Sequence, residues 1–300
     1  MNNLTLYLAS VLIWGSTWLV ITFQYGKVPA EVSVATRFAL AAALLAAWCL
    51  ARGLRMRFSL REHGWLALQG ALMFGLNYTC VYVAEQHIPS GLMAVIFSLL
   101  AILNILGARL LFGTPLTAGV LAGSALGIGG VALVCLPGLR LASGGHGGLG
   151  AGLAFALLGT VAASASNLLA QRNHRAGLPM LQGTAWAMSY GSAFVALYAL
   201  ALGRPFVLDL SARYLASLLY LAVFGSVLAF TAYLTLLGRI GAGRAGYTSV
   251  AIPVVALALS TAFEGLRWEW TLAAGAALCL LGNLLVLPRA PKPAEAEAAA

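Results

Sequence analysis

An internal repeat constrains this chain more than any other feature of its sequence. The segment from Ile88 to Leu136 returns, altered, at residues 240–288, at an offset of 152 residues with no gap. Glycines match at equivalent depths in the two copies, as Gly91 with Gly243, Gly113 with Gly265, Gly123 with Gly275 and Gly130 with Gly282. Each copy holds five hydrophobic spans, and an odd number of crossings inverts the second copy in the membrane. An inverted repeat places a central site between two halves that can rock, which is the plan of a transporter.

The composition independently indicates a membrane protein. The chain is 61% hydrophobic and 8% charged, with a mean hydropathy of +0.93, whereas soluble proteins contain about 25% charged residues. A bilayer core requires roughly 20 apolar residues per helix. We predict ten such spans, at residues 4–24, 30–51, 64–84, 89–112, 115–137, 149–171, 179–202, 213–237, 241–263 and 268–288. The predicted fold class is an all-α integral membrane protein, with ten transmembrane helices in two inverted five-helix repeats.

Breaks rich in proline and glycine divide the chain into parts. We predict a first repeat at residues 1–137, a glycine-rich linker at 138–148, a second repeat at 149–289 and a disordered cytoplasmic tail at 290–300. The linker rests on the run Ser143-Gly144-Gly145-His146-Gly147-Gly148, whose composition is typical of flexible connections. The tail contains mainly Pro, Ala and Glu. No catalytic domain fits outside the spans.

The distribution of cations predicts the orientation. With the N-terminus inside, eleven Lys and Arg residues lie in inner loops and span ends, against five in outer ones. This arrangement obeys the positive-inside rule, and ten spans return the C-terminus to the cytoplasm. We therefore interpret the net charge of +9 as topology and predict no nucleic-acid partner, because the arginines lie in short loops. The prediction is a multi-pass protein of the inner membrane, in contact with lipid, with both termini cytoplasmic.

The reactive side chains do not converge in the sequence. Cysteines within the spans and histidines at their ends share no metal-ligand spacing, so we predict no metal and no cofactor. An integral-membrane enzyme would need converging acid, base, nucleophile or metal ligands. The acidic residues near spans are instead dispersed at predicted outer ends, at Glu31, Glu85, Glu264 and Glu269. No ATP-binding motif is present either. We predict that the chain is not an enzyme, and keep a passive channel as the alternative to a carrier.

Polar and aromatic residues at helical spacing mark span faces that are turned away from lipid, because unpaired polar groups are costly in hydrocarbon. The sixth span carries such a stripe, at Thr160, Ser164, Asn167 and Gln171, which suits either a cavity wall or hydrogen bonding between helices. The third and eighth spans carry deep aromatic residues. We predict that a central cavity is surrounded by Tyr78, Tyr82, Asn104, Ser164, Asn167, Phe230, Tyr233 and Tyr247.

Two further residues need a physical reason within their spans. Arg37 lies about a third of the way along the second span, where a charge is costly. Our main expectation is a structural or gating ion pair with Glu31, Glu85 or Glu264, and the alternative is a contact with a substrate carboxylate. Pro253 interrupts the ninth span and frees a backbone carbonyl, for geometry or for a ligand. Its counterpart in the first copy is Ala101.

Several motifs resemble the EamA family of the drug/metabolite transporter superfamily. Trp14-Gly15-Ser16-Thr17-Trp18 resembles the tryptophan-glycine-serine signature of its first span, and Arg37 stands where the family often has an arginine. Pro253 and Glu264-Gly265 match the proline and later glutamate-glycine of its fourth-span pattern. The resemblance covers essentially the whole chain. It implies an inner-membrane carrier with its site between the halves, and structural or gating roles for Trp14, Gly15, Arg37, Pro253 and Glu264.

Length and layout are most similar to the YddG-type exporters of amino acids within this family. The first copy departs from the family pattern, because Ala101 replaces the proline and Phe112 the glutamate. The first span has no acidic residue, and the fourth and ninth have no central cation, which excludes the proton-exchange site of small multidrug exporters and argues against phosphate-bearing substrates. We predict a secondary exporter, working by alternating access, of neutral or zwitterionic amino acids or similar small metabolites, with aromatic and apolar ones favoured.

Overall fold

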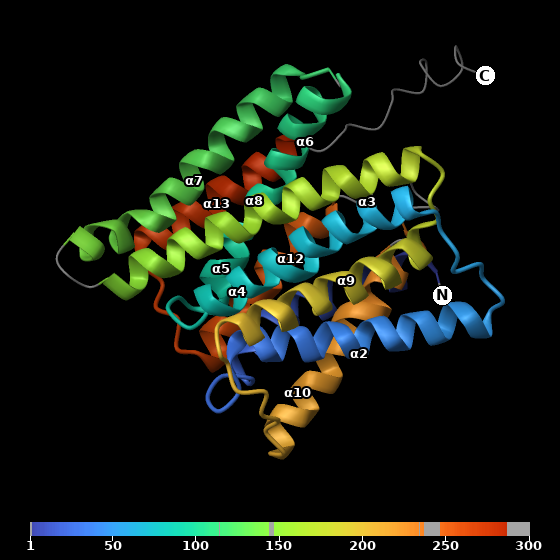
Figure 1. The fold of residues 1–300 in the computed structure, drawn as a ribbon. Helices are drawn as coiled ribbons and strands as arrows, with labels where there is room; N and C mark the ends of the chain where they lie inside the picture. Colours follow the sequence, from blue (N-terminus) through green and yellow to red (C-terminus); the bar gives the residue numbers. More distant parts are fainter. Residues whose placement is uncertain (1, 114, 144–146, 234, 237–246, 287–300) are drawn as a thin grey trace, which may run out of the picture.

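The structure is a computed structural model that describes residues 2–113, 115–143, 147–233, 235–236 and 247–286. Within α7, α8, α12 and α13, the side chains at 137–143, 147, 247, 249, 250 and 286 also lie outside the description. Helices account for every regular element of the described part (Figure 1). The prediction of an all-helical membrane fold is therefore confirmed.

The helices follow the predicted spans closely. The first repeat contains α1 (Asn3–Thr22), α2 (Ala30–Ala51), α3 (Leu60–Gly70), η1 (Ala71–Asn77), α4 (Tyr78–Ala84), α5 (Ser90–Phe97), α6 (Leu99–Phe112) and α7 (Ala118–Ser143). The second contains α8 (Gly147–Arg175), α9 (Met180–Ala201), α10 (Ala212–Ala222), η2 (Val223–Leu228), α12 (Tyr247–Phe263) and α13 (Trp270–Val286). Here η1 and η2 are π-helical turns; α3, η1 and α4 form one continuous span, and α5 and α6 form another.

Seven described spans are both long enough and apolar enough to cross a membrane. α9 has the length but is interrupted by polar residues, and it packs against α2 within the bundle (Figure 1). The described apolar stretches of the ninth and tenth spans, Ala251–Phe263 and Trp270–Leu285, are shorter. A helix that contacts other helices on several sides needs less apolar surface than one surrounded by lipid, which accounts for the polarity of α9.

Contacts between connections show that the two repeats are inverted. At one end of the bundle, the α1–α2 connection pairs with the α9–α10 connection, where Lys27 Nζ lies 3.7 Å from Asp209 Oδ1 and Arg204 Nη2 lies 3.5 Å from Glu31 Oε1. The α2–α3 connection instead meets the start of α9, where Trp186 Nε1 donates to the Met56 carbonyl. Equivalent connections of the two repeats therefore lie at opposite ends. We name these the outer end and the inner end, following the predicted orientation.

The repeat offset of 152 residues extends further back than the matching glycines indicated. Ser59 and Ser211, which are separated by this offset, both cap a helix with their side-chain oxygens, accepting from the amides three residues later. Both helices then change to π geometry at equivalent points, Ala71 and Val223. A π turn contains an extra residue and rotates the side chains that follow it. The third span of each repeat thus has the same backbone plan.

Glycines join the fifth span of one repeat to the fifth of the other. α7 and α13 lie side by side (Figure 1), and a Cβ added to Gly130 would lie 2.6 Å from the Gly275 carbonyl oxygen. A Cβ on Gly282 would lie 2.5 Å from the Gly123 oxygen. Because Gly123 corresponds to Gly275 and Gly130 to Gly282, these reciprocal contacts are those of a two-fold axis between the helices. The matching glycines of the sequence are therefore packing positions.

The end of the first repeat corrects one sequence prediction. We expected the fifth span to end at Pro137 and a flexible linker to begin at residue 138, but α7 continues as helix to Ser143, and α8 begins at Gly147. A helix can pass through a proline with the loss of one backbone hydrogen bond, and a proline does not end every membrane helix. Residues 144–146 and the predicted tail at 290–300 lie outside the described residues.

Candidate functional site

An aromatic cluster lies where spans one, two, three and eight meet. Phe74 and Tyr78 are stacked at 6.5 Å between ring centroids, and Phe74 also meets Phe230 edge-on at 6.1 Å. Trp14 lies 5.3 Å from both Phe230 and Tyr233. The sequence predicted Tyr78, Phe230 and Tyr233 as cavity residues and Trp14 as structural, and the structure brings all four into one cluster. Phe38, 4.6 Å from Tyr78, completes it.

The π-helical turns position the two central rings of this cluster. Tyr78 is the first residue after η1, and Phe230 follows shortly after η2. The two residues are separated by the repeat offset of 152, so they are equivalent positions of the inverted copies. Each half therefore presents one aromatic ring to the other from the same point of its third span. Both rings are half-buried.

The tryptophan-glycine motif of α1 packs against two elements of the second repeat, η2 and α12. Trp14 Nε1 donates to the Gly225 carbonyl in η2 at 3.2 Å. A Cβ on Gly15 would lie 2.6 Å from Val255 Cβ, so only glycine permits this approach of α1 to α12. Pro253 is buried inside α12, two residues from that contact. These observations support packing roles for Gly15 and Pro253.

The predicted polar lining is only partly explained by contacts among the described residues. Thr160 Oγ1 donates to the Ala156 carbonyl of its own helix. Ser164 is buried and Asn167 half-buried, and neither makes a hydrogen bond to another described residue. Asn104 Oδ1 is buried without a described partner. The Tyr247 side chain lies outside the description. Unpaired amides of this kind are what a polar solute could satisfy.

Arg37 does not form the ion pair that we expected. Arg37 is 1% exposed, but no carboxylate of the described residues lies within 4.0 Å of it, and Glu31 pairs with Arg204 instead. The Arg37 guanidinium instead lies over the Tyr78 ring, 4.8 Å from its centroid, and Nη1 donates to the Tyr82 hydroxyl at 3.5 Å. Cation–π contact and one hydrogen bond thus replace the salt bridge. Arg37 Nε keeps no described partner.

Tyr82 belongs to a polar network toward the outer end rather than to an open cavity wall. The ring is fully buried, and its hydroxyl donates to Gln24 Oε1 at 2.7 Å. One turn further along, Tyr25 donates to Glu85 Oε2 at 3.1 Å. Glu85 lies one residue beyond the third span, and burial raises its pKa well above the usual range, with Glu264 raising it further. This outer network therefore links the first three spans.

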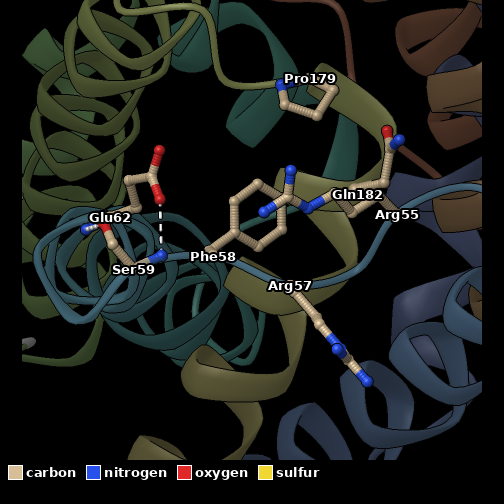
Figure 2. Close-up of a pocket in the computed structure, with 7 residues that line it drawn as sticks. All are labelled: Arg55, Arg57, Phe58, Ser59, Glu62, Pro179 and Gln182. Atoms are coloured by element: carbon tan, nitrogen blue, oxygen red, sulfur yellow. Dashed lines mark hydrogen bonds between the residues drawn. The ribbon is translucent and has the colours of Figure 1, made fainter.

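A cavity between described residues lies away from the aromatic cluster. A cavity of about 510 Å³ at the inner end is lined by Arg55, Arg57, Phe58, Ser59, Glu62, Pro179 and Gln182 (Figure 2). The Ser59 amide donates to Glu62 Oε2 at 2.6 Å. None of the predicted cavity residues lines this space. Within the described part, no three His, Cys, Asp or Glu side chains are placed to hold a metal ion.

Besides Phe38, sequence reasoning missed three contributors to this region. Phe74 was one apolar residue among many, and only its place in η1 makes it the ring that joins Tyr78 to Phe230. Gln24 was the last residue of the predicted first span and Tyr25 followed it. In the structure α1 ends before both, and polar residues at the end of a span attract no notice. A signal was available for Phe74 alone, since it lies four residues before Tyr78, at helical spacing.

Comparison with known proteins agrees with this architecture. The model of the EamA-like transporter family matches residues 2–136 and 150–287. The Escherichia coli K12 protein named as an uncharacterized inner membrane transporter, YedA, is 30% identical over 261 residues, covering 86% of this chain and 81% of its own length. Protein PecM of Dickeya dadantii is 32% identical over 223 residues, covering 73% and 69%. One crystal structure shares the fold, with a TM-score of 0.67 at 21% identity over 95% of this chain and 96% of the other.

Proposed function

Because this chain belongs to the EamA-like transporter family and is a multi-pass inner membrane protein, we propose that it exports amino acids with apolar and aromatic side chains by alternating access. Membership of the family makes it a transporter of small molecules rather than an enzyme. The names of the relatives YedA and PecM specify no solute. The substrate class is therefore argued from the site. The likeness to YddG-type exporters rests on the length and layout of the sequence alone.

The aromatic cluster carries the proposal. Tyr78 and Phe230 come from equivalent positions of the two halves, and Phe74 contacts both. A ring or branched side chain placed between such groups gains apolar contact and edge-to-face interactions. An aromatic site between two halves that can move relative to each other would take up a solute with an apolar body.

The charges around the cluster favour a zwitterion over an anion. Arg37 Nε is a buried donor without a described partner, but the guanidinium already lies over the Tyr78 ring. Asn104, on α6, has a buried oxygen without a described partner, which could accept from an ammonium group. One cation and neutral amides can hold the two ends of an amino acid, whereas a phosphate would need several cations.

Hydrogen bonds and ion pairs between connections support alternating access. They tie the outer end together, through Lys27–Asp209, Arg204–Glu31 and the Glu264–Ser90 contact. The described cavity of about 510 Å³ lies at the inner end. A carrier closed at one end by pairs that can break is able to exchange this state for its opposite. A passive channel would not require such closure.

Transport by purified protein in proteoliposomes tests the proposal. We expect saturable uptake of phenylalanine and leucine, stimulated by the same solute inside, because only a carrier shows counterflow. Tyr78→Ala and Phe230→Ala should each weaken phenylalanine transport by roughly 1 kcal/mol, about fivefold, and alanine transport less. Tyr198→Ala, an exposed ring on α9, is the matched control. Normal transport of the whole panel by both variants would refute the site, and uptake without counterflow would favour a channel.

A further inference from the structure

Two buried groups of opposite charge lie near one another at the outer end without forming a pair. Glu85 is 6% exposed and Arg37 is 1% exposed. Each has an atom without a partner in the described part of the chain, Oε1 of Glu85 and Nε of Arg37. The Tyr82 hydroxyl, which accepts from Arg37, belongs to α4, and Glu85 is the residue that caps the end of this helix. Burying an unpaired charge costs several kcal/mol, so one of these two groups is expected to be neutral.

Glu85 is the group that can become neutral. Arginine keeps its proton in proteins, whereas a carboxyl group gains one readily when it is desolvated. The groups facing Glu85 come from four elements: Tyr25 after α1, Arg37 on α2, Tyr82 on α4 and Glu264 after α12. No lysine or arginine of the described residues lies within 4.0 Å of its carboxyl oxygens. Burial and the charge of Glu264 favour the proton, and the Tyr25 hydrogen bond and Arg37 oppose it.

We propose that Glu85 binds the proton that this carrier exchanges for its exported solute. The inference rests on the proposed function and adds the coupling ion to it. While the outer end is open, a proton from the external solution binds Oε1 and converts the carboxylate to the neutral acid. After the outer end has closed, as it is in the structure, the proton leaves to the cytoplasmic solution and the carboxylate re-forms, paired with the Arg37 guanidinium through a movement of Tyr82. One proton enters for each solute that leaves, and no other reactant is needed.

The position of the network suits this role. The Tyr82 hydroxyl is bonded to Gln24. The helix of Tyr82 begins at Tyr78, a ring of the aromatic cluster, and the Arg37 guanidinium contacts both tyrosines. Arg37 therefore joins the outer network to the solute site, and the charge of Glu85 acts on it. When Glu85 is protonated, Arg37 stays with Tyr78 and Tyr82; when Glu85 is a carboxylate, it competes with these tyrosines for the guanidinium. This shared partner is what couples two ligands in one carrier.

Proteoliposomes with an acidic lumen and the membrane potential clamped at zero test the coupling. Protons then leave while solute enters, and a difference of about one pH unit drives at most roughly tenfold accumulation for one-for-one exchange. We expect the wild-type protein to accumulate phenylalanine under this gradient. Glu85→Gln, which resembles the neutral acid, should lose the accumulation and keep solute counterflow. Glu269→Gln, an exposed carboxyl, should behave as wild type.

Two variants keep the test decisive if Glu85→Gln does not fold. Glu85→Asp retains a carboxyl and should retain gradient-driven accumulation. Tyr25→Phe removes the hydrogen bond that holds the proton affinity down, so the pH at which accumulation falls to half should move upward. Accumulation by Glu85→Gln equal to that of wild type, wild-type counterflow without any effect of the gradient, or an unmoved Tyr25→Phe profile would each overturn the proton site.

Thermal unfolding separates failure of this site from failure of the proposed function. A carboxyl whose pKa is higher in the folded protein than in the unfolded chain, about 4.3, stabilises the fold at low pH and loses this contribution as pH rises through the folded pKa. The Tm of wild type in detergent should therefore fall with rising pH more steeply than that of Glu85→Gln, even if no amino acid is transported. Parallel profiles would refute proton binding at Glu85, whatever the solute is.

Discussion

Glu264 holds the start of α5 from across the repeat boundary. Its carboxylate accepts from the Ser90 amide at 3.2 Å and from the Ser90 hydroxyl at 2.5 Å. Ser90 is the first residue of α5, where the helix N-terminus leaves amides unpaired and attracts negative charge. The fourth span of each repeat thus meets the other at the outer end. The position equivalent to Glu264 in the first copy is Phe112, so the Glu264–Ser90 latch, the pair of hydrogen bonds described above, has no equivalent there.

Glu264→Gln should weaken this latch. The neutral amide keeps one acceptor but loses the charge that strengthens both hydrogen bonds, so we expect a loss of about 1 kcal/mol in the free energy of unfolding. Thermal or denaturant unfolding in detergent measures it. Glu269→Gln, at an exposed position nearby in sequence, provides the baseline. Equal stability of the two variants would show that the contact contributes nothing.

Gly130→Ala should destabilise the protein, whereas Gly129→Ala should not. A Cβ on Gly130 would lie 2.6 Å from the Gly275 oxygen and 2.8 Å from the Cys279 amide, but a Cβ on Gly129 meets nothing within 4 Å. Overpacking of this kind costs roughly 1–3 kcal/mol, and alanine at an unobstructed helix position is favourable by up to about 1 kcal/mol. Unfolding of the two neighbouring variants compares them. Similar stability would refute the reciprocal packing of α7 against α13.

Arg37→Ala should lower the amount of folded protein in the membrane. It removes the cation over the Tyr78 ring and the donor to Tyr82. Arg37→Lys should rescue only part of this loss, because an ammonium group lacks the planar fork that stacks on a ring while it donates. Quantification of the membrane fraction on gels measures the effect. Normal abundance of Arg37→Ala, with transport lost only for solutes that carry a carboxylate, would instead assign Arg37 to the substrate.

Labelling of single cysteines tests the orientation of the chain. We expect Ser59→Cys and Ala296→Cys to be protected in intact cells, and Ser143→Cys and Ser211→Cys to react with an impermeant reagent. The background must lack Cys49, Cys80, Cys135 and Cys279. The expectation follows from the eleven-to-five distribution of cations. If Ser59→Cys reacts in intact cells and Ser143→Cys does not, the orientation is the opposite one and both termini are external.

The sequence predicted most of the fold because membrane spans are constrained strongly and locally. Length, hydropathy and turn residues placed α2 at its observed bounds, Ala30–Ala51. The matching glycines predicted the duplication because the two-fold contact between α7 and α13 requires small residues at four related positions. The end of α7 was predicted wrongly because a proline is a weak stop signal within a membrane helix.

The site was less predictable because its contacts depend on distances between spans. Tyr78, Phe230 and Tyr233 were accessible as deep aromatic residues, but nothing in the sequence showed that Phe74 would join them. The expected partner of Arg37 was wrong for a related reason. Three carboxyl groups were within plausible reach, and the structure gives each a different partner: Arg204 for Glu31, Tyr25 for Glu85 and Ser90 for Glu264.

At one equivalent position, the two π-helical turns carry side chains of very different size. Phe74 in η1 reaches Phe230 in the other half, whereas its equivalent in η2 is the small, buried Ser226, which donates to the Leu221 carbonyl of its own span. Two identical bulky side chains cannot occupy one space on a symmetry axis, so duplicated halves must diverge where they touch. Residues that are identical in the two copies are those of the shared backbone plan. A pair of equivalent residues that differ strongly in size marks a place where the two halves touch, and such pairs can locate the centre of other duplicated chains from their sequences.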